Sequence, residues 1–494
     1  MSQDIAAPQS RHFVLIAAIL ASSMGFIDGS VISIAIPAIR ANLGATLADA
    51  QWISNGYLLF LSALILLGGA AGDRFGLRTT FGWGIVVFVL ASMVCALAPS
   101  PAVLVIARAV QGAGAAFMVP GSLAIIAKAY PREERGKAIG IWAAASSLTS
   151  IAGPIIGGFV LTAFGDWSWR LVFAINLPLG GIALALLWFK VNADRPEAGR
   201  RLDIVGAALA TLALMLVAYG LTGDGSESTP GLLHMAGFVG GGLVLGAIFL
   251  IWEARSASPM LPLRLFANKA FSGANGLTFA LYFALGGAMF FLPMTMIGGW
   301  GVTPANVSLA LLPMGVLLTI LSSFSGKWAD TFGPAPLIAL GSLIVAAAFF
   351  LLGITTPLHN VWFAVLPCVA LLGLGMGLVV SPLSTAVMTS VADHDTGVAS
   401  GVNNAVARVA GLMAVALLGL VVASVFERAL GSAAELPIFF GLPASGLTEA
   451  EEAMRLAATD AAFAAIAYVT AGLSLLSAVI AWLTLERKSL LARA

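Results

Sequence analysis

Two short stretches decide the fold: "GAAGDRFG", residues Gly69–Gly76, and "GKWADTFG", residues Gly326–Gly333. Both read G-x-x-x-D-x-F-G, they start 257 positions apart, and each follows one long apolar run and precedes the next. Other glycines recur at similar offsets, with Gly112, Gly114 and Gly140 echoed by Gly373, Gly375 and Gly397. The chain is therefore predicted to contain two related halves that run in the same direction.

The composition requires most of the chain to lie in a membrane. Hydrophobic residues make up 60% and charged residues 10% of the 494 positions, whereas a soluble domain has roughly 45–50% and about 25%. The surplus apolar surface calls for membrane lipids around the chain. A net charge of +1 gives no sign of a nucleic-acid partner, and no cluster of cysteine and histidine suggests a metal or cofactor.

Fourteen apolar runs are long enough to cross the hydrocarbon core as helices, which requires about 20 residues. They lie at 13–37, 51–71, 81–98, 103–127, 137–163, 171–189, 203–221, 234–252, 269–296, 305–326, 336–353, 360–388, 397–425 and 459–484. The first repeated loop follows the second run, and its copy follows the tenth. The loop and its copy are therefore eight runs apart. Six helices in each half, plus the inserted seventh and eighth helices, explain this spacing.

We therefore predict an all-α polytopic membrane protein. An N-terminal six-helix bundle is expected at 1–190, a linker with the two inserted helices at 191–268, and a C-terminal six-helix bundle at 269–494. Duplicated bundles with a site between them are typical of transporters. With both termini inside, 18 of the 24 Lys and Arg residues lie on the cytoplasmic side and four lie outside, so the positive-inside rule predicts cytoplasmic termini.

One carboxylate lies where it costs free energy. Asp28 is in the first span, in "GFIDGSVISIAIP", and is the only acid that we place deep in a span. Arg108 is in the fourth span, in "RAVQGAGAA", and charges inside a membrane usually mark a pathway or a partner. We hypothesise that Asp28 binds and releases a proton and is coupled to Arg108. The alternative is an arginine that backbone carbonyl groups hold for structural reasons.

The repeated loops are candidate gates at the inner face of the membrane. The candidate gate residues are Gly69, Asp73, Arg74, Gly76, Arg78, Asp330 and Gly333. A carboxylate there can pair with a helix end in one conformation and release it in another. The simpler interpretation is a basic loop that only sets the orientation, but the recurrence of the Gly–Asp–Gly spacing favours a gate.

Two further stretches carry small or polar stripes. In "GPIIGG", Gly153 and Gly157 share one helix face and Pro154 permits a kink, which suits a seam between rocking bundles; ordinary tight packing is the alternative. In "GVASGVNNAVARVAG", Asn404 and Arg408 share a face that is predicted to line a cavity or to contact another helix.

Together these stretches resemble the major facilitator superfamily, specifically its fourteen-span drug:H⁺ antiporter branch, over nearly the whole chain. "FIDGSVISIAIP" resembles the first-span aspartate motif of the branch, and "GAAGDRFGLR" the superfamily's loop between spans 2 and 3. "RAVQGAGAA" resembles the fourth-span motif, and "GPIIGG", with Gly153, Pro154, Gly157 and Gly158, the fifth-span antiporter motif. Leu77 and Thr149 depart from these patterns, since the motifs usually have a basic residue and often a glycine there.

The resemblance implies the major facilitator fold and a proton-coupled antiporter that exports lipophilic or amphipathic small molecules, as in multidrug efflux, from the plasma (inner) membrane of a bacterium. A dedicated exporter of an endogenous metabolite, lipid or siderophore stays open, as does a transport-inactive scaffold or sensor. An enzyme is not expected, because no nucleophile–base pair or metal constellation occurs. We expect a monomer. Some relatives use a periplasmic adaptor protein as a partner.

The substrate cavity is expected to be mostly apolar and aromatic, because such cavities tolerate varied ligands. The candidates to line it are Asn55 and Tyr57 in the second span, Phe279, Tyr282, Phe283, Phe290 and Met294 in the ninth, and Asn404 and Arg408 in the thirteenth. An aromatic stripe at helical spacing is equally typical of helix packing.

Overall fold

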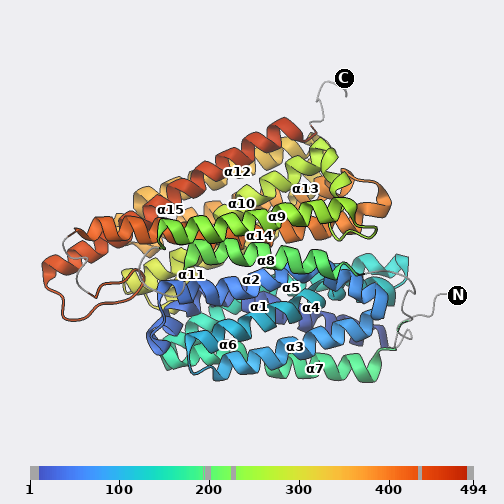
Figure 1. Ribbon diagram of the computed structural model, residues 1–494, viewed down its shortest axis with the longest axis horizontal. Helices are drawn as coiled ribbons and strands as arrows, with labels where there is room; N and C mark the ends of the chain where they lie inside the picture. The colour runs from blue at the N-terminus through green and yellow to red at the C-terminus, as the bar shows by residue number, and fades with distance from the viewer. Residues whose placement is uncertain (1–9, 193, 195–201, 224–229, 432–436, 487–494) are drawn as a thin grey trace. The chain divides into compact units, whose positions relative to one another are not determined.

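The computed structural model describes residues 10–192, 194, 202–223, 230–431 and 437–486, which are almost entirely helical (Figure 1). Fourteen helical segments of this described part are long and apolar enough to cross a membrane, which confirms the predicted fold class. The residues form two compact units. The first comprises Met1–Ala45, Trp52–Gly220 and Leu232–Pro262, and the second comprises Thr46–Gln51, Leu221–Gly231 and Leu263–Ala494.

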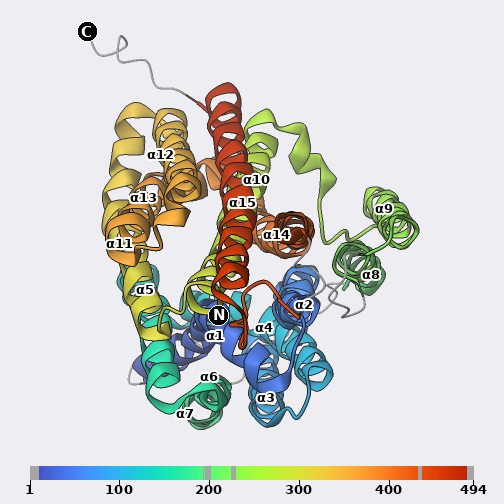
Figure 2. The ribbon, with the colours of Figure 1, turned by 90° about the vertical axis from the view of Figure 1, so that its left-hand side faces the viewer.

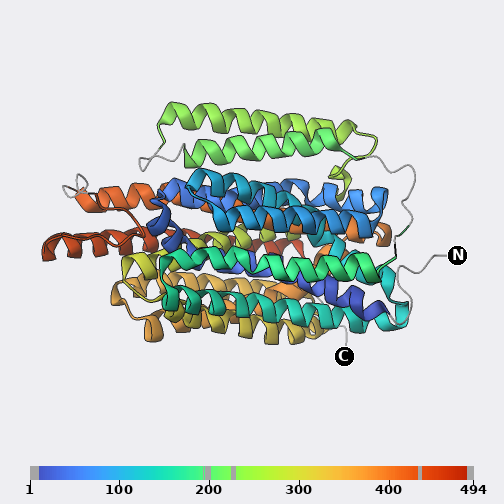
Figure 3. The ribbon, with the colours of Figure 1, turned by 90° about the horizontal axis from the view of Figure 1, so that it is seen from below.

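The first unit contains nine α-helices of the described chain, apart from the first turn of α2 and the last two residues of α8. They are α1 (Arg11–Leu43), α2 (Leu47–Phe75), α3 (Leu77–Leu97), α4 (Pro101–Ala129), α5 (Arg132–Phe164), α6 (Trp169–Ala174), α7 (Asn176–Lys190), α8 (Ile204–Thr222) and α9 (Leu232–Arg255). The short α6 and the following α7 together make one span, Asp166–Lys190. Figures 2 and 3 show α8 and α9 side by side as a hairpin.

The second unit contains the remaining helices of the described residues. They are α10 (Lys269–Met294), α11 (Pro304–Phe332), α12 (Pro334–Thr355), α13 (Leu366–Thr389), α14 (Thr396–Leu430) and α15 (Glu449–Thr484). A π-helical turn at Thr295–Gly299 extends α10, and another at Val361–Val365 precedes α13.

Local sequence sets several helix ends. Gly44 ends α1 in the left-handed conformation, with φ of 63°, and its N–H donates to the carbonyl oxygen of Arg40, as glycine does at many helix C-termini. The sequence predicts that the segment 426–458, which contains "TEAEEAMRL", is mostly a solvated loop or a short surface helix. Its last ten residues instead belong to the helix of the last span, because Thr448 and Glu451 form a capping box that starts α15 at Glu449.

Glycines in α4 bring three helices of the first unit into backbone contact. A Cβ atom on Gly112 would lie 2.3 Å from the carbonyl oxygen of Tyr57 in α2, and one on Gly114 would lie 2.7 Å from the backbone nitrogen of Phe88 in α3. Small residues allow such close approach between membrane helices. Packing is therefore a sufficient reason for the small residues of "QGAGAA".

The second unit repeats this arrangement at the residues that the sequence pairs with Gly112 and Gly114. A Cβ atom on Gly373 in α13 would lie 2.7 Å from Met314 Cα in α11, and one on Gly375 would lie 2.6 Å from the carbonyl oxygen of Gly341 in α12. Each unit thus uses two glycines, two positions apart, to hold a central helix against two neighbours. This supports the predicted internal repeat.

Replacing Gly112 by alanine is expected to lower the free energy of unfolding by about 1–3 kcal/mol, because the added methyl group overlaps a carbonyl oxygen and forces the backbones of α2 and α4 apart. Thermal unfolding of the purified protein in detergent measures the loss. Gly140→Ala in α5 is the matched control, since nothing lies within 4 Å of its Cβ position. Equal unfolding temperatures for the two variants would contradict the packing role.

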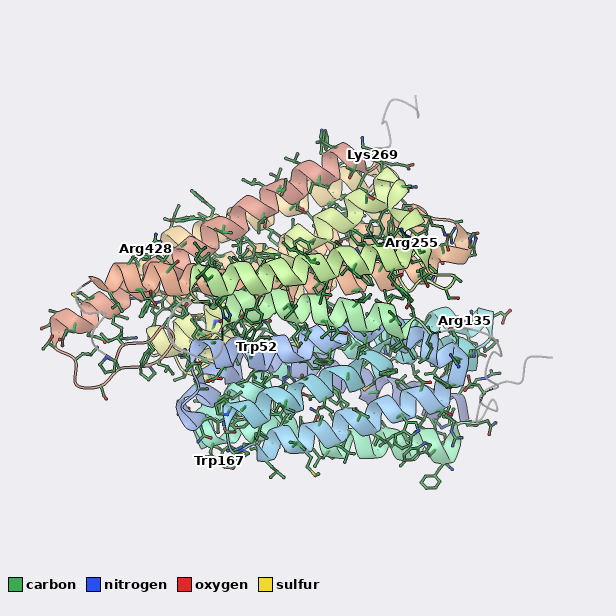
Figure 4. All side chains as sticks on the ribbon, viewed as in Figure 1. Trp52, Arg135, Trp167, Arg255, Lys269 and Arg428 are labelled. Carbon is green, nitrogen blue, oxygen red and sulfur yellow. The ribbon has the colours of Figure 1, made fainter. Side chains whose placement is uncertain are left out.

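The surface of each unit is apolar, as contact with lipid requires. Large hydrophobic side chains are exposed on both units, including Phe189 at 83% and Phe363 at 86%. In the first unit, Figure 4 shows Trp52 and Trp167 at one end and Arg135 and Arg255 at the other. Tryptophan is enriched at membrane interfaces, and basic residues are enriched in the loops on one side.

Candidate functional site

Asp28 lies in the interior of the first unit, where α1 meets α4. Its side chain is completely buried. Arg108 Nη1 donates a hydrogen bond to Asp28 Oδ2, and Gln111 Nε2 donates one of 3.0 Å to Asp28 Oδ1. Both carboxylate oxygens therefore have a donor, and one donor is cationic, which makes that hydrogen bond a strong one. The structure brings together the two residues that the sequence names as coupled.

Arg108 is held by more than its counter-charge. Its Nε donates to the carbonyl oxygen of Ile53 in α2 at 3.0 Å, and its Nη1 donates to Gln111 Oε1 at 2.6 Å. The guanidinium carbon lies 4.3 Å from the centre of the Tyr57 ring and 5.7 Å from that of Phe173, within range of cation–π attraction. The arginine thus links α1, α2 and α4, and the rings exclude water from it.

Sequence reasoning missed the residue that organises this site, Gln111. Its Nε2 donates to Ser92 Oγ of α3 at 2.8 Å as well as to Asp28. Asn176 Nδ2 of α7 donates to the same serine oxygen at 3.3 Å. One signal could have found Gln111: it lies three positions after Arg108 and therefore on the same helix face. Nothing in the sequence shows that Ser92 and Asn176 meet it.

The two substrate candidates of α2 lie near Arg108. Tyr57 places its ring against the guanidinium. Asn55 is completely buried, and within the described part of the chain neither its Oδ1 nor its Nδ2 has a hydrogen-bond partner. A buried amide without partners costs free energy. A polar group of a ligand could satisfy it, so Asn55 stays a candidate for substrate binding.

The candidates of the second unit do not gather at one point. Phe279 is exposed at 39%, with its ring centre 6.1 Å from that of Phe283, whereas Phe290 and Met294 are buried in the core. Tyr282 lies within electrostatic range of Arg408.

Asn404 is exposed. Its neighbour Asn403, which was not among the predicted residues, donates hydrogen bonds to Asn275 Oδ1 at 3.2 Å and to Thr278 Oγ1 at 2.8 Å. The residue of α14 that makes these polar contacts with α10 is therefore Asn403, one position before the predicted Asn404. Substrate binding by the residues of α10 and α14 stays a prediction.

The glycines of "GPIIGG" pack α5 directly on the segment of α1 that carries Asp28. A Cβ atom on Gly157 would lie 2.5 Å from Val31 Cγ1, and one on Gly153 would lie 3.0 Å from Ser30 Oγ and 3.3 Å from Ile27 Cα. The residues on both sides of Asp28 in the sequence therefore touch this motif. Pro154 and Gly158 lie in the same stretch, inside α5.

An acid that sequence reasoning missed binds the backbone of the first candidate gate. Asp194, which follows α7, accepts hydrogen bonds from the backbone nitrogens of Leu77 at 2.8 Å and Arg78 at 3.1 Å, and Lys128 Nζ lies 3.3 Å from its Oδ2. The carboxylate thus caps the N-terminus of α3, where a negative charge is favourable. Gly76, with φ of 92°, makes the turn before it.

The remaining gate residues lie at the same loop and at its copy. Asp73 is half-buried, Arg74 is exposed with its guanidinium carbon 5.3 Å from the centre of the Phe75 ring, and Arg78 Nη2 donates to the carbonyl oxygen of Trp188 at 2.8 Å. In the second unit Asp330 is exposed and Gly333, with φ of 83°, separates α11 from α12. Gly69 has no atom within 4 Å of its Cβ position.

Known proteins share this sequence over most of its length. The model of the Major Facilitator Superfamily matches residues 18–415 and 276–492. The methylenomycin A resistance protein of Streptomyces coelicolor is 32% identical over 412 residues, 83% of this chain and 85% of that protein. The tetracenomycin C resistance and export protein of Streptomyces glaucescens is 32% identical over 418 residues, 83% and 76% of the two chains. The multidrug resistance protein B homolog of Mycobacterium tuberculosis is 30% identical over 413 residues, with the same coverage.

Solved structures share the fold. A bacterial homologue of the human lysosomal transporter Spinster, inward-facing and unoccupied, matches with a TM-score of 0.67 and 18% identity over 98% of this chain and 100% of that chain. A D-xylose–proton symporter matches with a TM-score of 0.62 and 16% identity over 96% and 98%. The chain is therefore an integral, multi-pass membrane protein with a transporter fold, and it belongs to the major facilitator superfamily.

Proposed function

We propose that the protein is a proton-coupled antiporter that exports lipophilic or amphipathic small molecules by alternating access. The observation that carries this proposal is the buried pair of Asp28 and Arg108, completed by Gln111. An ion pair inside an apolar bundle costs free energy unless it has a function or excellent geometry. In a transporter, a carboxylate in this position can exchange its cationic partner for a proton.

The hydrogen bonds define how a proton would act. While Asp28 is ionised, Arg108 and Gln111 occupy both of its oxygens. A proton on the carboxyl group removes the charge that holds Arg108, and the arginine keeps Ile53, Gln111 and the Tyr57 ring as partners. Protonation therefore loosens α1 from α4 while α4 stays attached to α2. Proton entry from outside and release inside would then bias the exchange between conformations.

The names of the relatives indicate the substrate class. They include resistance proteins for methylenomycin A and tetracenomycin C and a multidrug resistance protein homologue, all of which support export of small-molecule drugs. Asn55 and Tyr57 would supply polar and aromatic contacts next to Arg108. We place the protein in the plasma (inner) membrane of a bacterium with both termini in the cytoplasm, because most Lys and Arg residues then lie inside.

Transport in proteoliposomes tests the proposal. Purified protein is reconstituted, a pH gradient is imposed, and uptake of a cationic dye and of an anionic amphiphile is followed in parallel with proton flux. Drug-driven proton movement in the opposite direction is expected, and it should vanish when an ionophore collapses the gradient. Transport that ignores the gradient would contradict proton coupling, and the absence of any flux would contradict the transport function.

A dedicated exporter of one endogenous compound is the second candidate. It is supported by the relative that is named for the resistance to and export of a single compound, tetracenomycin C. Deletion of the gene separates the two candidates. Increased sensitivity to several unrelated drugs supports multidrug export, whereas accumulation of one endogenous metabolite, lipid or siderophore inside the cell supports the dedicated exporter.

A further inference from the structure

A second pair of acids is buried in the hairpin of the inserted helices α8 and α9. Asp203 immediately precedes α8, and Glu253 lies in the last turn of α9. The eighth apolar run is predicted at 234–252, directly before Glu253. In the structure α9 continues to Arg255, and Glu253 is only 3% exposed, with Asp203 at 8%.

One oxygen of each acid has protein donors. Asp203 Oδ1 accepts hydrogen bonds from the Gly206 backbone nitrogen at 2.8 Å and from Trp252 Nε1 at 2.9 Å. Glu253 Oε2 accepts one from the Leu261 backbone nitrogen at 2.9 Å. Asp203 thus caps α8, and Glu253 fixes the segment that follows α9. These bonds explain why the residues are acids, but they involve only one of the two oxygens of each carboxyl group.

The other two oxygens converge on the same place. A Cβ atom on Gly206 would lie 2.5 Å from Glu253 Oε1 and 2.8 Å from Asp203 Oδ2, and the two side chains act on each other directly. Within the described residues, neither oxygen has a hydrogen-bond donor. Gly206 leaves the space in which the two carboxyl groups meet.

Within the described residues no cation acts on Glu253, and Asp203 is the one charged group that does. Arg255 is exposed, and it borders a cavity of about 370 Å³ together with Asp203, Trp252 and Ser256. The segment from Ser256 to Pro262 carries no titratable side chain. Two ionised carboxylates in contact and shielded from water repel each other, and one proton between them removes the repulsion and supplies the missing donor.

We propose that Asp203 and Glu253 share one proton and form a proton-binding site on α8 and α9, distinct from Asp28 on α1. The proton lies in a hydrogen bond between Glu253 Oε1 and Asp203 Oδ2. Both acids also accept hydrogen bonds from outside the pair, Asp203 from Gly206 and Trp252 and Glu253 from Leu261, so the proton is needed only between the two remaining oxygens. Asp203 borders the cavity, through which a proton can reach the pair.

The shared proton has a consequence for the connection between the two units. Glu253 anchors Leu261, and the chain enters the second unit at Leu263. Loss of the proton would make the two carboxylates repel each other, so Glu253 would turn away and release this anchor. The site therefore ties the start of the connecting segment to the proton concentration on the side of the membrane that the cavity faces.

Thermal unfolding of the purified full-length protein in detergent, from mildly acidic to alkaline pH, tests the site without transport. The wild type is expected to lose at least about 2 °C more than Glu253→Gln as the pH rises. The glutamine retains a permanent N–H donor toward Asp203 and does not depend on a proton. Glu133→Gln, at an exposed acid of α5, is the matched control and should follow the wild type.

A spectroscopic readout assigns the proton itself. Infrared difference spectra between acidic and alkaline buffer should show the carbonyl band of a protonated carboxyl group in the wild type, and Glu253→Gln should lose one such band. In Gly206→Ala the new methyl group separates the acids, and the same band should disappear. Identical pH profiles and spectra for wild type and Glu253→Gln would overturn the proposal. Stabilisation of the wild type by sodium at constant pH, absent in Glu253→Gln, would overturn it in favour of a metal cation.

Both readouts report protonation of the protein and not movement of a substrate. A protein that fails to transport can still show the shared proton, and a proton antiporter can lack it. Loss of the shared proton and loss of transport are therefore observed independently of each other.

Discussion

Asp28→Asn abolishes transport driven by a pH gradient and leaves a folded protein. Asparagine has the shape of the protonated aspartic acid and retains an oxygen for Arg108, so it imitates a state that the proposed cycle itself visits. It cannot bind or lose a proton, so a pH gradient cannot change its charge and cannot drive transport. The expected rate in proteoliposomes with an imposed gradient equals that of empty vesicles, while the unfolding temperature shows that the protein is intact.

Two further measurements make this result specific. Asp166→Asn, which changes an exposed acid at the start of the sixth span, should transport like the wild type. Exchange of substrate without a gradient should persist in Asp28→Asn, because the mutation removes the proton site and not the path. If Asp28→Asn still accumulates substrate against its concentration in response to the gradient, Asp28 is not the coupling group.

Arg108→Ala is expected to cost about 3–5 kcal/mol of unfolding free energy, the usual loss when one partner of a buried ion pair is removed. The mutation leaves Asp28 buried without its cation and removes the side-chain hydrogen bond to the Ile53 carbonyl oxygen. In the Asp28→Asn background the same change should cost less, because no charge is then stranded. A double-mutant cycle of unfolding measures the difference, and a coupling of about 0.5–3 kcal/mol is expected for residues in contact.

Arg108→Lys separates charge from geometry. Lysine keeps a cation near Asp28 but cannot reproduce the planar set of hydrogen bonds to Ile53, Gln111 and Asp28. Stability should therefore recover toward the wild type while coupled transport stays impaired. Additive effects of Asp28→Asn and Arg108→Ala on unfolding would show that the two residues do not act as a pair.

The sequence carried most of the fold because hydropathy and repetition are local signals. Apolar runs of about 20 residues give the spans, and the two G-x-x-x-D-x-F-G loops give the parallel halves. The pairing of Asp28 with Arg108 was also predictable, since each is a charge that needs a partner in an apolar setting.

What sequence could not give are contacts between distant segments. Ser92 and Asn176 are ordinary polar residues of apolar helices until Gln111 is seen to join one of them to Asp28. Asp194 meets Leu77 across 117 positions of the chain. The burial of Glu253 is hidden for another reason: a charge ends an apolar run, so hydropathy alone does not show that an acid in the last turn of a helix is buried.

The contact of Gly112 has an evolutionary consequence. Its neighbour is the carbonyl oxygen of Tyr57, an atom that every residue type places at that position. No substitution at residue 57 can therefore make room for a side chain at 112, and the position has no compensating partner. Gly157 differs, because its neighbour is the Val31 side chain, which a smaller residue could replace. Related chains should thus keep glycine at the position of Gly112. At the position of Gly157 they should accept a larger residue when the residue at the position of Val31 is smaller.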